Sequence, residues 1–323
     1  MQQRYVVTGG AGFIGSHVVA RLFELGHGAV VLDNFSTGKR SNLEEVQAEH
    51  PDGDLRVIDG SITSPGDVAA ACDGASGVVH LAALPSVVRS VEAPLESHEH
   101  NVTGTVNVLD VARQNGVRVV YAGSSSAYGD QDVQFKHEEL RESPLSPYAA
   151  SKLAGELYCR SFSRVYDHTS VVTRFFNVFG PRQVPDSPYS GVVAAFCFAV
   201  LNGTQPRIDG DGSQSRDFTY VGDVARGVVD ALTKDLPIGC HTVNLAAGGN
   251  HSINELLQVL KDYASSDIEP NYAPPRNGDV KHSQADANRV KELLGFEAEV
   301  SFVEGLQRTF DWYRKTYATE TSR

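Results

Sequence analysis

Runs of apolar residues alternate with segments of helical pattern through the first half of the chain. Apolar residues at every third or fourth position favour a helix, and short apolar runs bounded by turn residues favour a buried strand. We therefore expect strands at residues 4–8, 29–32, 55–58, 78–81, 117–122 and 169–174. Because strands that alternate with helices form parallel sheets covered on both faces, the sequence predicts an α/β fold with a Rossmann-type doubly wound parallel sheet.

Two of the predicted helices, at residues 101–115 and 148–166, carry apolar residues on more than one face. One face can cover the sheet, and the second face needs another partner. We expect that partner to be the same two helices of a second subunit, which gives a homodimer with a four-helix interface. The alternative is a monomer in which the C-terminal part of the chain covers these faces.

The charge of the chain restricts its partners. With 323 residues, 41% hydrophobic and 21% charged, the composition is that of a globular enzyme, and the net charge is −12. This charge opposes binding to nucleic acid and to anionic membranes. No apolar stretch is long enough to span a bilayer, and the first strand begins almost at Met1, which leaves no room for a signal peptide. We expect a cytoplasmic protein.

The cysteines and histidines give little support for a metal site. The four cysteines are widely spaced and lie mostly in apolar segments: Cys72, Cys159, Cys197 and Cys240. That distribution is typical of free buried thiols, since disulfide frameworks and zinc sites have regular spacings. We expect no metal and no disulfide.

A glycine-rich segment follows the first predicted strand and opens the first helix. Gly9, Gly12 and Gly15 can turn tightly, let the backbone approach a pyrophosphate and let the helix pack close to the strand. Ile14 lies on the apolar face of that helix, which we expect to extend to Leu25. Asp33 ends the second predicted strand, where a carboxylate can bind the ribose hydroxyls of adenosine. This acid favours NAD over NADP.

The two halves of the chain differ in composition. After residue 176 the alternation of strands and helices weakens, and proline and glycine become frequent. Such a segment is typical of a smaller, loop-rich lobe that binds substrate. We therefore divide the chain into an NAD-binding Rossmann domain, residues 1–176, and a mainly substrate-binding lobe, residues 177–323. Some segments of the lobe are expected to return to the first domain.

A tyrosine and a lysine lie four residues apart at the start of a predicted helix. Tyr148 and Lys152 therefore share one face, one turn apart. A free tyrosine has a pKa near 10, and an adjacent ammonium and a positively charged nicotinamide would both lower it. Ser124 ends the fifth predicted strand, where its hydroxyl can bond a substrate hydroxyl and pass a proton toward the phenolate. The sequence predicts a catalytic set of Ser124, Tyr148 and Lys152.

With these residues in place, the chain resembles the extended short-chain dehydrogenase/reductase superfamily and, within it, the UDP-hexose 4-epimerases. The motifs that carry the resemblance span nearly the full length: TGGAGFIGSH, LDNFSTG, VVHLAAL, NVTGTVNVLDVA, SSSAYG, SPYAASK, RFFNVFGPRQ, GDGSQSRDFTYV and RNGDVKHSQAD. The resemblance implies that Tyr148 is the base, that Lys152 holds the nicotinamide ribose and that Ser124 contacts the reacting oxygen. It implies inversion at the sugar C4 through a transient 4-keto sugar, with no net consumption of NAD.

The resemblance also implies the contacts of the cofactor. Besides the glycine loop they are Phe13, Ile14, Asp33, Asn34, Ile62, Ala82, Asn101, Tyr148 and Lys152. The chain departs from the family at one of these places. The family commonly has an acid after the third strand that bonds the adenine amine, and here Ser61 must replace it.

For the substrate, the resemblance implies a UDP-sugar bound by Ser86, Ser126, Asn177, Arg216, Arg276, Asp279 and Ser283. The two arginines match the positions that clamp the diphosphate, and Asp279 matches the position that binds the uridine ribose. Ser283 matches a gatekeeper that is bulky in epimerases restricted to glucose and galactose, and Ser86 matches a contact to an acetamido group. We therefore predict interconversion of UDP-GlcNAc and UDP-GalNAc, alongside UDP-Glc and UDP-Gal.

Two other functions stay open at this point. A nucleotide-sugar 4,6-dehydratase shares the fold and the first oxidation, but such enzymes commonly have an Asp-Glu pair after the catalytic Ser or Thr. Ser125 and Ser126 stand there in this chain, although Glu138 is an acid that could act from elsewhere. A non-catalytic regulator that senses dinucleotides is the second alternative, and the intact Ser124, Tyr148 and Lys152 disfavour it.

Overall fold

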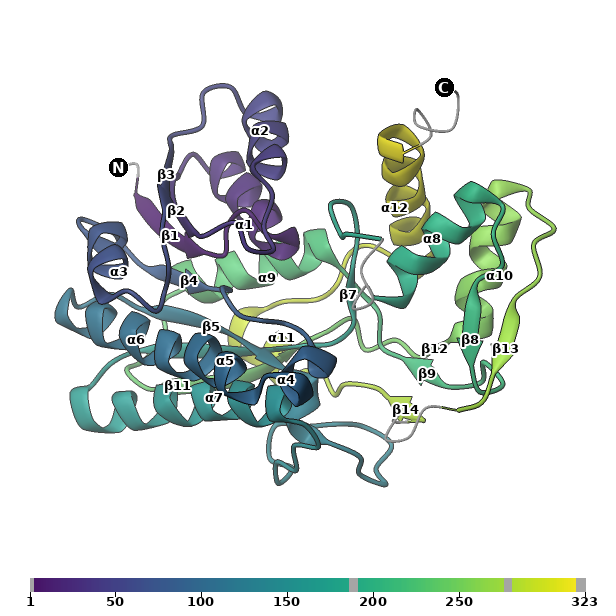
Figure 1. Cartoon of the computed structure of the whole chain (residues 1–323). Helices are drawn as coiled ribbons and strands as arrows, with labels where there is room; N and C mark the ends of the chain where they lie inside the picture. Colours follow the sequence, from purple (N-terminus) through teal and green to yellow (C-terminus); the bar gives the residue numbers. More distant parts are fainter. Residues whose placement is uncertain (1–2, 186–190, 276–280, 318–323) are drawn as a thin grey trace.

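A seven-stranded parallel sheet forms the centre of the computed structural model, which describes residues 3–185, 191–275 and 281–317. Its order is β11-β6-β5-β4-β1-β2-β3, which confirms the Rossmann-type fold (Figure 1). All six predicted strands are present, within two residues of their expected bounds. The strands are β1 (Arg4–Thr8), β2 (Gly28–Asp33), β3 (Leu55–Asp59), β4 (Val78–His80), β5 (Val119–Ser124), β6 (Ser170–Phe175) and β11 (Cys240–Leu245).

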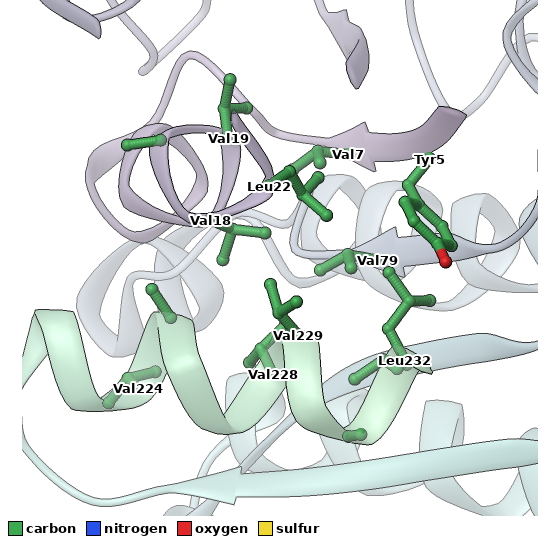
Figure 2. Packing of buried hydrophobic residues seen from close by; sticks show 14 of the residues in the cluster. Tyr5, Val7, Val18, Val19, Leu22, Val79, Val224, Val228, Val229 and Leu232 are labelled. Carbon is green, nitrogen blue, oxygen red and sulfur yellow. The ribbon is translucent and has the colours of Figure 1, made fainter. Parts of the chain in front are cut away.

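Helices cover both faces of this sheet because successive strand residues point to opposite sides. One face packs against α1 (Phe13–Glu24), α2 (Arg40–Glu49), α9 (Val221–Thr233) and α11 (Asn288–Leu294). The other face packs against α3 (Pro65–Cys72), α6 (Gly104–Gln114) and α7 (Pro147–Tyr166). Figure 2 shows Val18 and Leu22 of α1 facing Val228 of α9, with Val7 and Val79 of the sheet beside them.

One expectation for α1 is wrong. Leu25 does not belong to the apolar face of the helix, because α1 ends at Glu24 and Leu25 is 44% exposed. The backbone N–H of Leu25 bonds the carbonyl oxygen of Leu22. Gly26 then takes a φ of 74°, a left-handed conformation that glycine adopts readily and that turns the chain toward β2.

A smaller lobe lies beside the sheet domain and has its own apolar core (Figure 1). Its described residues form three helices and three small sheets: α8 (Val192–Asn202), α10 (Ile253–Ala264), α12 (Phe302–Tyr317), β8 (Arg207–Asp209) with β13 (Asn271–Ala273), β9 (Ser215–Arg216) with β12 (His251–Ser252) and β14 (His282–Ser283), and β7 (Val178–Phe179) with β10 (Thr219–Tyr220). The later segments α9, β11 and α11 pack in the sheet domain. The division at residue 176 stays a prediction.

The expectation of free buried thiols is confirmed at most of the cysteines. Cys72, Cys159 and Cys197 are buried free thiols, and Cys240 is a half-buried one. His98 stands two residues from His100, yet no group of three or more His, Cys, Asp or Glu side chains in the described ranges is arranged to hold a metal ion. Within the same ranges, every helix is too short or too polar to cross a membrane.

Candidate active site

The carboxyl ends of the strands surround a cavity of about 260 Å³. In doubly wound sheets this crevice binds the ligand where the strand order reverses, which here is the boundary between β1 and β4. The lining brings together residues far apart in the sequence, and it includes Gly9, Gly12, Phe13, Ile14, Gly15, Asp33, Asn34, Ser61, Ile62, Ala82, Tyr148 and Lys152. Most of the predicted cofactor residues therefore share one cavity.

The glycine loop fits a dinucleotide because side chains are excluded from it. Gly9 has a φ of 71°, and a Cβ built there would lie 2.8 Å from the backbone nitrogen of Ala82. A Cβ at Gly15 would collide with the carbonyl oxygen of Gly9. The N–H of Gly12 donates to that same oxygen at 3.0 Å and closes the turn before α1. The helix begins without a side-chain cap, so its N-terminal N–H groups are available to a phosphate.

Asp33 lies buried at the end of β2, with both carboxylate oxygens held. Oδ2 accepts the N–H of Ala11 at 3.0 Å, and Oδ1 accepts the N–H of Phe35 at 2.9 Å. Burial raises the pKa of Asp33, while these two hydrogen bonds oppose the rise. Each oxygen keeps a second lone pair, so the oriented carboxylate can still accept hydrogen bonds from the hydroxyls of a ribose.

Ser61 and Asn101 differ in how they face the cavity. Ser61 lines it, with its hydroxyl 2.8 Å from the hydroxyl of Thr63. Asn101 is buried and does not line it. Its Oδ1 accepts the N–H of Leu84 at 2.7 Å, and its Nδ2 donates to the hydroxyl of Ser151 at 3.0 Å. The side chain of Asn101 thus holds the wall behind the cavity.

Two of the three predicted catalytic residues, Tyr148 and Lys152, line this cavity, and the third, Ser124, directly follows the lining residue Gly123. Ser124 ends β5, and Tyr148 and Lys152 occupy the first two turns of α7. Burial raises the pKa of Tyr148, and a hydrogen bond from the hydroxyl of Ser124 partly offsets that rise. Burial also lowers the pKa of Lys152 to about 8. Its Nζ lies 4.4 Å from the centre of the Tyr121 ring, a cation–π contact.

The electrostatic expectation joins two positive charges, the ammonium of Lys152 and a nicotinamide. With the groups of the chain alone, burial dominates and the pKa of Tyr148 is raised. The physical reason is that the phenol loses water, while the ammonium is placed over the Tyr121 ring. The groups of the chain alone therefore keep Tyr148 protonated at neutral pH.

The predicted sugar-binding serines are ordered by local hydrogen bonds. The hydroxyls of Ser124 and Ser126 lie 2.8 Å apart, at the start of a short 3₁₀ turn, η2 (Ser125–Tyr128). Ser86 is buried and caps the N-terminus of α4 (Val87–Glu92), where its hydroxyl accepts the N–H of Arg89 at 3.0 Å. These hydroxyls are fixed in position before any substrate binds.

The predicted diphosphate and gatekeeper residues are neighbours in the smaller lobe. Arg216 of β9 and Ser283 of β14 are directly paired in a parallel ladder. Asn177 is exposed, with a φ of 34°, and its Nδ2 donates to the carbonyl oxygen of Asp217 at 3.1 Å. Arg276 and Asp279 lie outside the described residues, so their predicted contacts stay predictions.

The sequence analysis missed Asp217, which orders the loops around Arg216. This buried carboxylate accepts the N–H of Gly248 at 3.0 Å and the N–H of Ala285 at 3.1 Å. Burial raises its pKa to about 7. The signal was an aspartate directly after Arg216, but an isolated Asp in a polar segment does not indicate burial.

The sequence analysis also missed a chain of hydrogen bonds beneath the cofactor cavity. His80 of β4 bonds the hydroxyl of Thr8 through Nδ1 at 2.7 Å and the hydroxyl of Thr105 through Nε2 at 3.0 Å. Thr105 donates to the carbonyl oxygen of Asn101, so we assign the ring proton to Nε2. Burial lowers the pKa of His80 to about 3, which keeps the ring neutral. This chain joins β1, β4 and the helical segment that carries Asn101.

Glu138, the acid that could serve a dehydratase, is bonded to strand β11 of the sheet. Its Oε1 accepts the backbone N–H of Asn244 at 2.6 Å, and it does not line the cofactor cavity. The side chain of Asn244 in turn accepts the hydroxyl of Tyr128 at 2.6 Å. Glu138 therefore anchors its loop to β11.

Comparison with known proteins gives a consistent assignment. Residues 5–246 match the model of the NAD dependent epimerase/dehydratase family. The chain is 38% identical over 324 residues to a UDP-glucose 4-epimerase of Mycolicibacterium smegmatis, covering 96% of this chain and 98% of that protein. A relative from Bacillus cytotoxicus, 30% identical over 98% of this chain and 99% of its own length, is a UDP-N-acetyl-alpha-D-glucosaminuronate decarboxylase. The relatives thus include more than one reaction.

Solved structures agree with the fold over the whole length. A UDP-N-acetylglucosamine 4-epimerase from Methanobrevibacter ruminantium, in complex with UDP-N-acetylmuramic acid, has a TM-score of 0.91 and 36% identity, covering 98% of this chain and 99% of that one. A Thermus thermophilus UDP-glucose 4-epimerase in complex with NAD has a TM-score of 0.87 and 35% identity, covering 97% of this chain and 100% of that one. The expectations of an enzyme of this kind and of NAD as its cofactor are confirmed. The chain belongs to the NAD dependent epimerase/dehydratase family.

Proposed function

We propose that the protein inverts C4 of UDP-hexoses, and that UDP-GlcNAc and UDP-GalNAc are its preferred pair, alongside UDP-Glc and UDP-Gal. One observation carries this proposal: the cavity that holds the glycine cradle and Asp33 also holds Tyr148 and Lys152. When bound there, NAD supplies the chemistry of taking a hydride from a carbinol carbon and returning it. The relatives that act on UDP-sugars support the substrate class.

Tyr148 is proposed to take the proton of the sugar 4-hydroxyl, with the hydroxyl of Ser124 as the relay to it. Because burial raises the pKa of Tyr148, the phenolate must be stabilised by positive charge that arrives with the cofactor. Lys152, with a pKa of about 8, is mostly protonated at neutral pH and can hold the nicotinamide ribose. The same phenol then returns the proton after the 4-keto sugar has rotated in the site.

The other proposed contacts bind successive parts of the substrate. Arg216, with Arg276, would bind the diphosphate, since guanidinium meets phosphate through paired hydrogen bonds. The family resemblance assigns the uridine ribose to Asp279, the sugar to Ser126 and the diphosphate or sugar region to Asn177. These assignments stay proposals.

The preference for N-acetylated sugars rests on two small side chains. Ser283 is half-buried and paired with Arg216, so a larger side chain there would stand beside the diphosphate clamp and reduce the room for the sugar. Ser86 is buried with its hydroxyl fixed, and that hydroxyl can still meet an acetamido group. The structural similarity to a UDP-N-acetylglucosamine 4-epimerase supports this preference.

The rival reactions lack support from the site. A dehydratase needs an acid near the sugar, and Ser125 and Ser126 stand where the acids commonly lie, while the carboxylate of Glu138 accepts the N–H of Asn244. A non-catalytic regulator has no need for the shared cavity of Tyr148 and Lys152. Neither alternative is favoured by a specific observation.

The proposed homodimer rests on the surface of α7. Leu157, Tyr158, Val165 and Tyr166 are 40–67% exposed, although all four have large apolar surfaces. On α6 the situation differs from our expectation, because most of its apolar residues are buried within this chain. The exposed face of α7 therefore supports the proposed dimer more than α6 does. A cytoplasmic location likewise stays a prediction.

Product analysis tests the function. Purified protein is incubated without added NAD with a panel of UDP-hexoses, and products are followed by NMR and mass spectrometry. We expect equilibration of UDP-GlcNAc with UDP-GalNAc at unchanged mass, since tightly bound cofactor is recycled. A product lighter by one water would instead establish a dehydratase. Absence of conversion for every sugar, even with NAD supplied, would contradict the proposal.

A further inference from the structure

The backbone N–H of Tyr148 has an unusual partner. In the first turn of a helix the N–H groups have no intrahelical acceptor and need partners from outside. In α7, Pro147 has no N–H, and Ala149 donates to the hydroxyl of the N-cap residue Ser146 at 3.1 Å. Tyr148 donates instead to the hydroxyl of Ser90, at 3.0 Å and 58 residues away in the sequence.

Ser90 is built for this contact. It is fully buried, and it is the buried residue of the otherwise exposed or half-buried helix α4. Its hydroxyl donates to the carbonyl oxygen of Val87 at 2.6 Å, which leaves a lone pair directed away for Tyr148. Donor and acceptor roles of the hydroxyl are therefore both used.

The carbonyl side of Tyr148 is held as well. The hydroxyl of Ser151 donates to the carbonyl oxygen of Tyr148 at 2.8 Å. Ser151 itself receives the Nδ2 donor of Asn101, whose Oδ1 holds Leu84. Both backbone polar groups of Tyr148 are thus connected to the segment from Leu84 to Ser90, which also carries the proposed sugar contact Ser86.

We propose that Ser90 is a positioning residue of the reaction: by accepting the N–H of Tyr148 it sets where the phenol stands relative to Ser124 and Lys152. This inference rests on the proposed function, because it assigns Tyr148 the role of base. The anchored N–H and the phenol belong to the same residue. If the first turn of α7 shifts, the phenolic oxygen of Tyr148 therefore shifts with it. Proton transfer depends steeply on such placement.

The matched pair of variants is Ser90→Ala and Ser97→Ala. Ser97 is also buried, at 1% exposure, on the neighbouring helix α5 (Pro94–His98), and among the described residues its hydroxyl has no hydrogen-bond partner. Each change removes a buried hydroxyl oxygen beside α7. Only Ser90→Ala removes the acceptor of the Tyr148 N–H.

We expect Ser90→Ala to lower kcat about 10-fold to 100-fold, the effect of a small misplacement of a catalytic group, with KM within about twofold. Ser97→Ala should keep the kcat of the parent. Ser90→Thr keeps the hydroxyl and should restore most of the loss. Ser90→Cys, which keeps the size but is a weak acceptor, should resemble Ser90→Ala and serves if the alanine variant does not fold.

A second readout does not depend on turnover. The phenol of Tyr148 is titrated by NMR in NAD-loaded protein carrying ¹³C-labelled tyrosine, with Tyr148→Phe for assignment. Because the hydrogen bond from Ser124 lowers the pKa of Tyr148, its weakening in Ser90→Ala should move that pKa upward, whereas Ser97→Ala should not. Parent values of kcat and of this pKa in Ser90→Ala would overturn the inference. If the parent turns over no UDP-hexose, the proposed function fails and the titration alone decides the inference.

Discussion

The glycine cradle allows a prediction with an internal control, Gly9→Ala against Gly26→Ala. Both glycines have left-handed backbones, with φ of 71° and 74°. A Cβ at Gly26 meets nothing within 4 Å. A Cβ at Gly9 would lie 2.8 Å from the nitrogen and 2.9 Å from the Cα of Ala82, so the two changes differ in contact and not in conformation.

The expected magnitudes follow from that difference. The left-handed conformation costs an alanine about 1–2 kcal/mol at either site. At Gly9 the Ala82 backbone must also move, although its N–H is bonded to the hydroxyl of Thr8 at 3.2 Å, and overpacking of this kind costs about 1–3 kcal/mol more. If this extra strain narrows the pyrophosphate site, the Kd of NAD rises about 10-fold to 100-fold, since 1.4 kcal/mol corresponds to a factor of ten.

The assay compares cofactor content with stability. NAD is released from each purified variant and quantified, its Kd is measured by calorimetry, and Tm is recorded by circular dichroism. Gly26→Ala should lower Tm by a few degrees and retain the parent content of NAD. Gly9→Ala should lose NAD. Equal NAD content and equal Kd in the two variants would refute the assignment of this loop to the cofactor.

Three further predictions concern the proposed base Tyr148, the proposed gatekeeper Ser283 and the buried ion pair between Glu156 and Arg174. Tyr148→Phe should lower kcat by about 10²–10⁴-fold, the contribution of a positioned base, with unchanged NAD content. The kcat of the parent should rise with pH as the phenol of Tyr148 ionises. A Tyr148→Phe variant with the parent kcat would exclude Tyr148 as the base. Ser283→Tyr should abolish conversion of the acetylated pair and spare UDP-Glc and UDP-Gal in the NMR assay, and equal effects on both pairs would exclude the gatekeeper. Glu156→Ala removes the fully buried partner of Arg174, at 2.7 Å, and leaves Glu142, at 2.9 Å, to pair with the same guanidinium. The change should cost about 3 kcal/mol in urea unfolding, the lower end for breaking a buried pair. A loss below about 1 kcal/mol would contradict the burial of the pair.

The sheet domain was largely predictable because its signals are local. The apolar runs and the glycine spacing lie within short windows, and β1 to β6 appear close to their expected bounds. β11 was not predicted, since Thr242 and Asn244 interrupt its apolar pattern. Asn244 is buried because its side chain bonds Tyr128 and the backbone of Lys136, partners that a single window cannot show.

The candidate site was predictable as a set of residues but not as a geometry. Tyr148 and Lys152 share a helix face by spacing alone, whereas the placement of Lys152 over the Tyr121 ring depends on how α7 packs on β5. The same holds for the contact between Ser90 and Tyr148, which joins two helices across 58 residues. The pairing of Arg216 with Ser283 lies in strands of two residues each, which are too short for a periodic signal.

The most direct test of the central claim follows the hydrogen at C4. UDP-GlcNAc carrying deuterium at C4 is incubated with the purified protein in ordinary water, and UDP-GalNAc is isolated and analysed by NMR and mass spectrometry. If the hydride is taken and returned at the same carbon within one cavity, the product keeps its deuterium at C4. Inversion with exchange of that deuterium for solvent hydrogen would contradict the account, and so would a deuterated sugar recovered without any inversion.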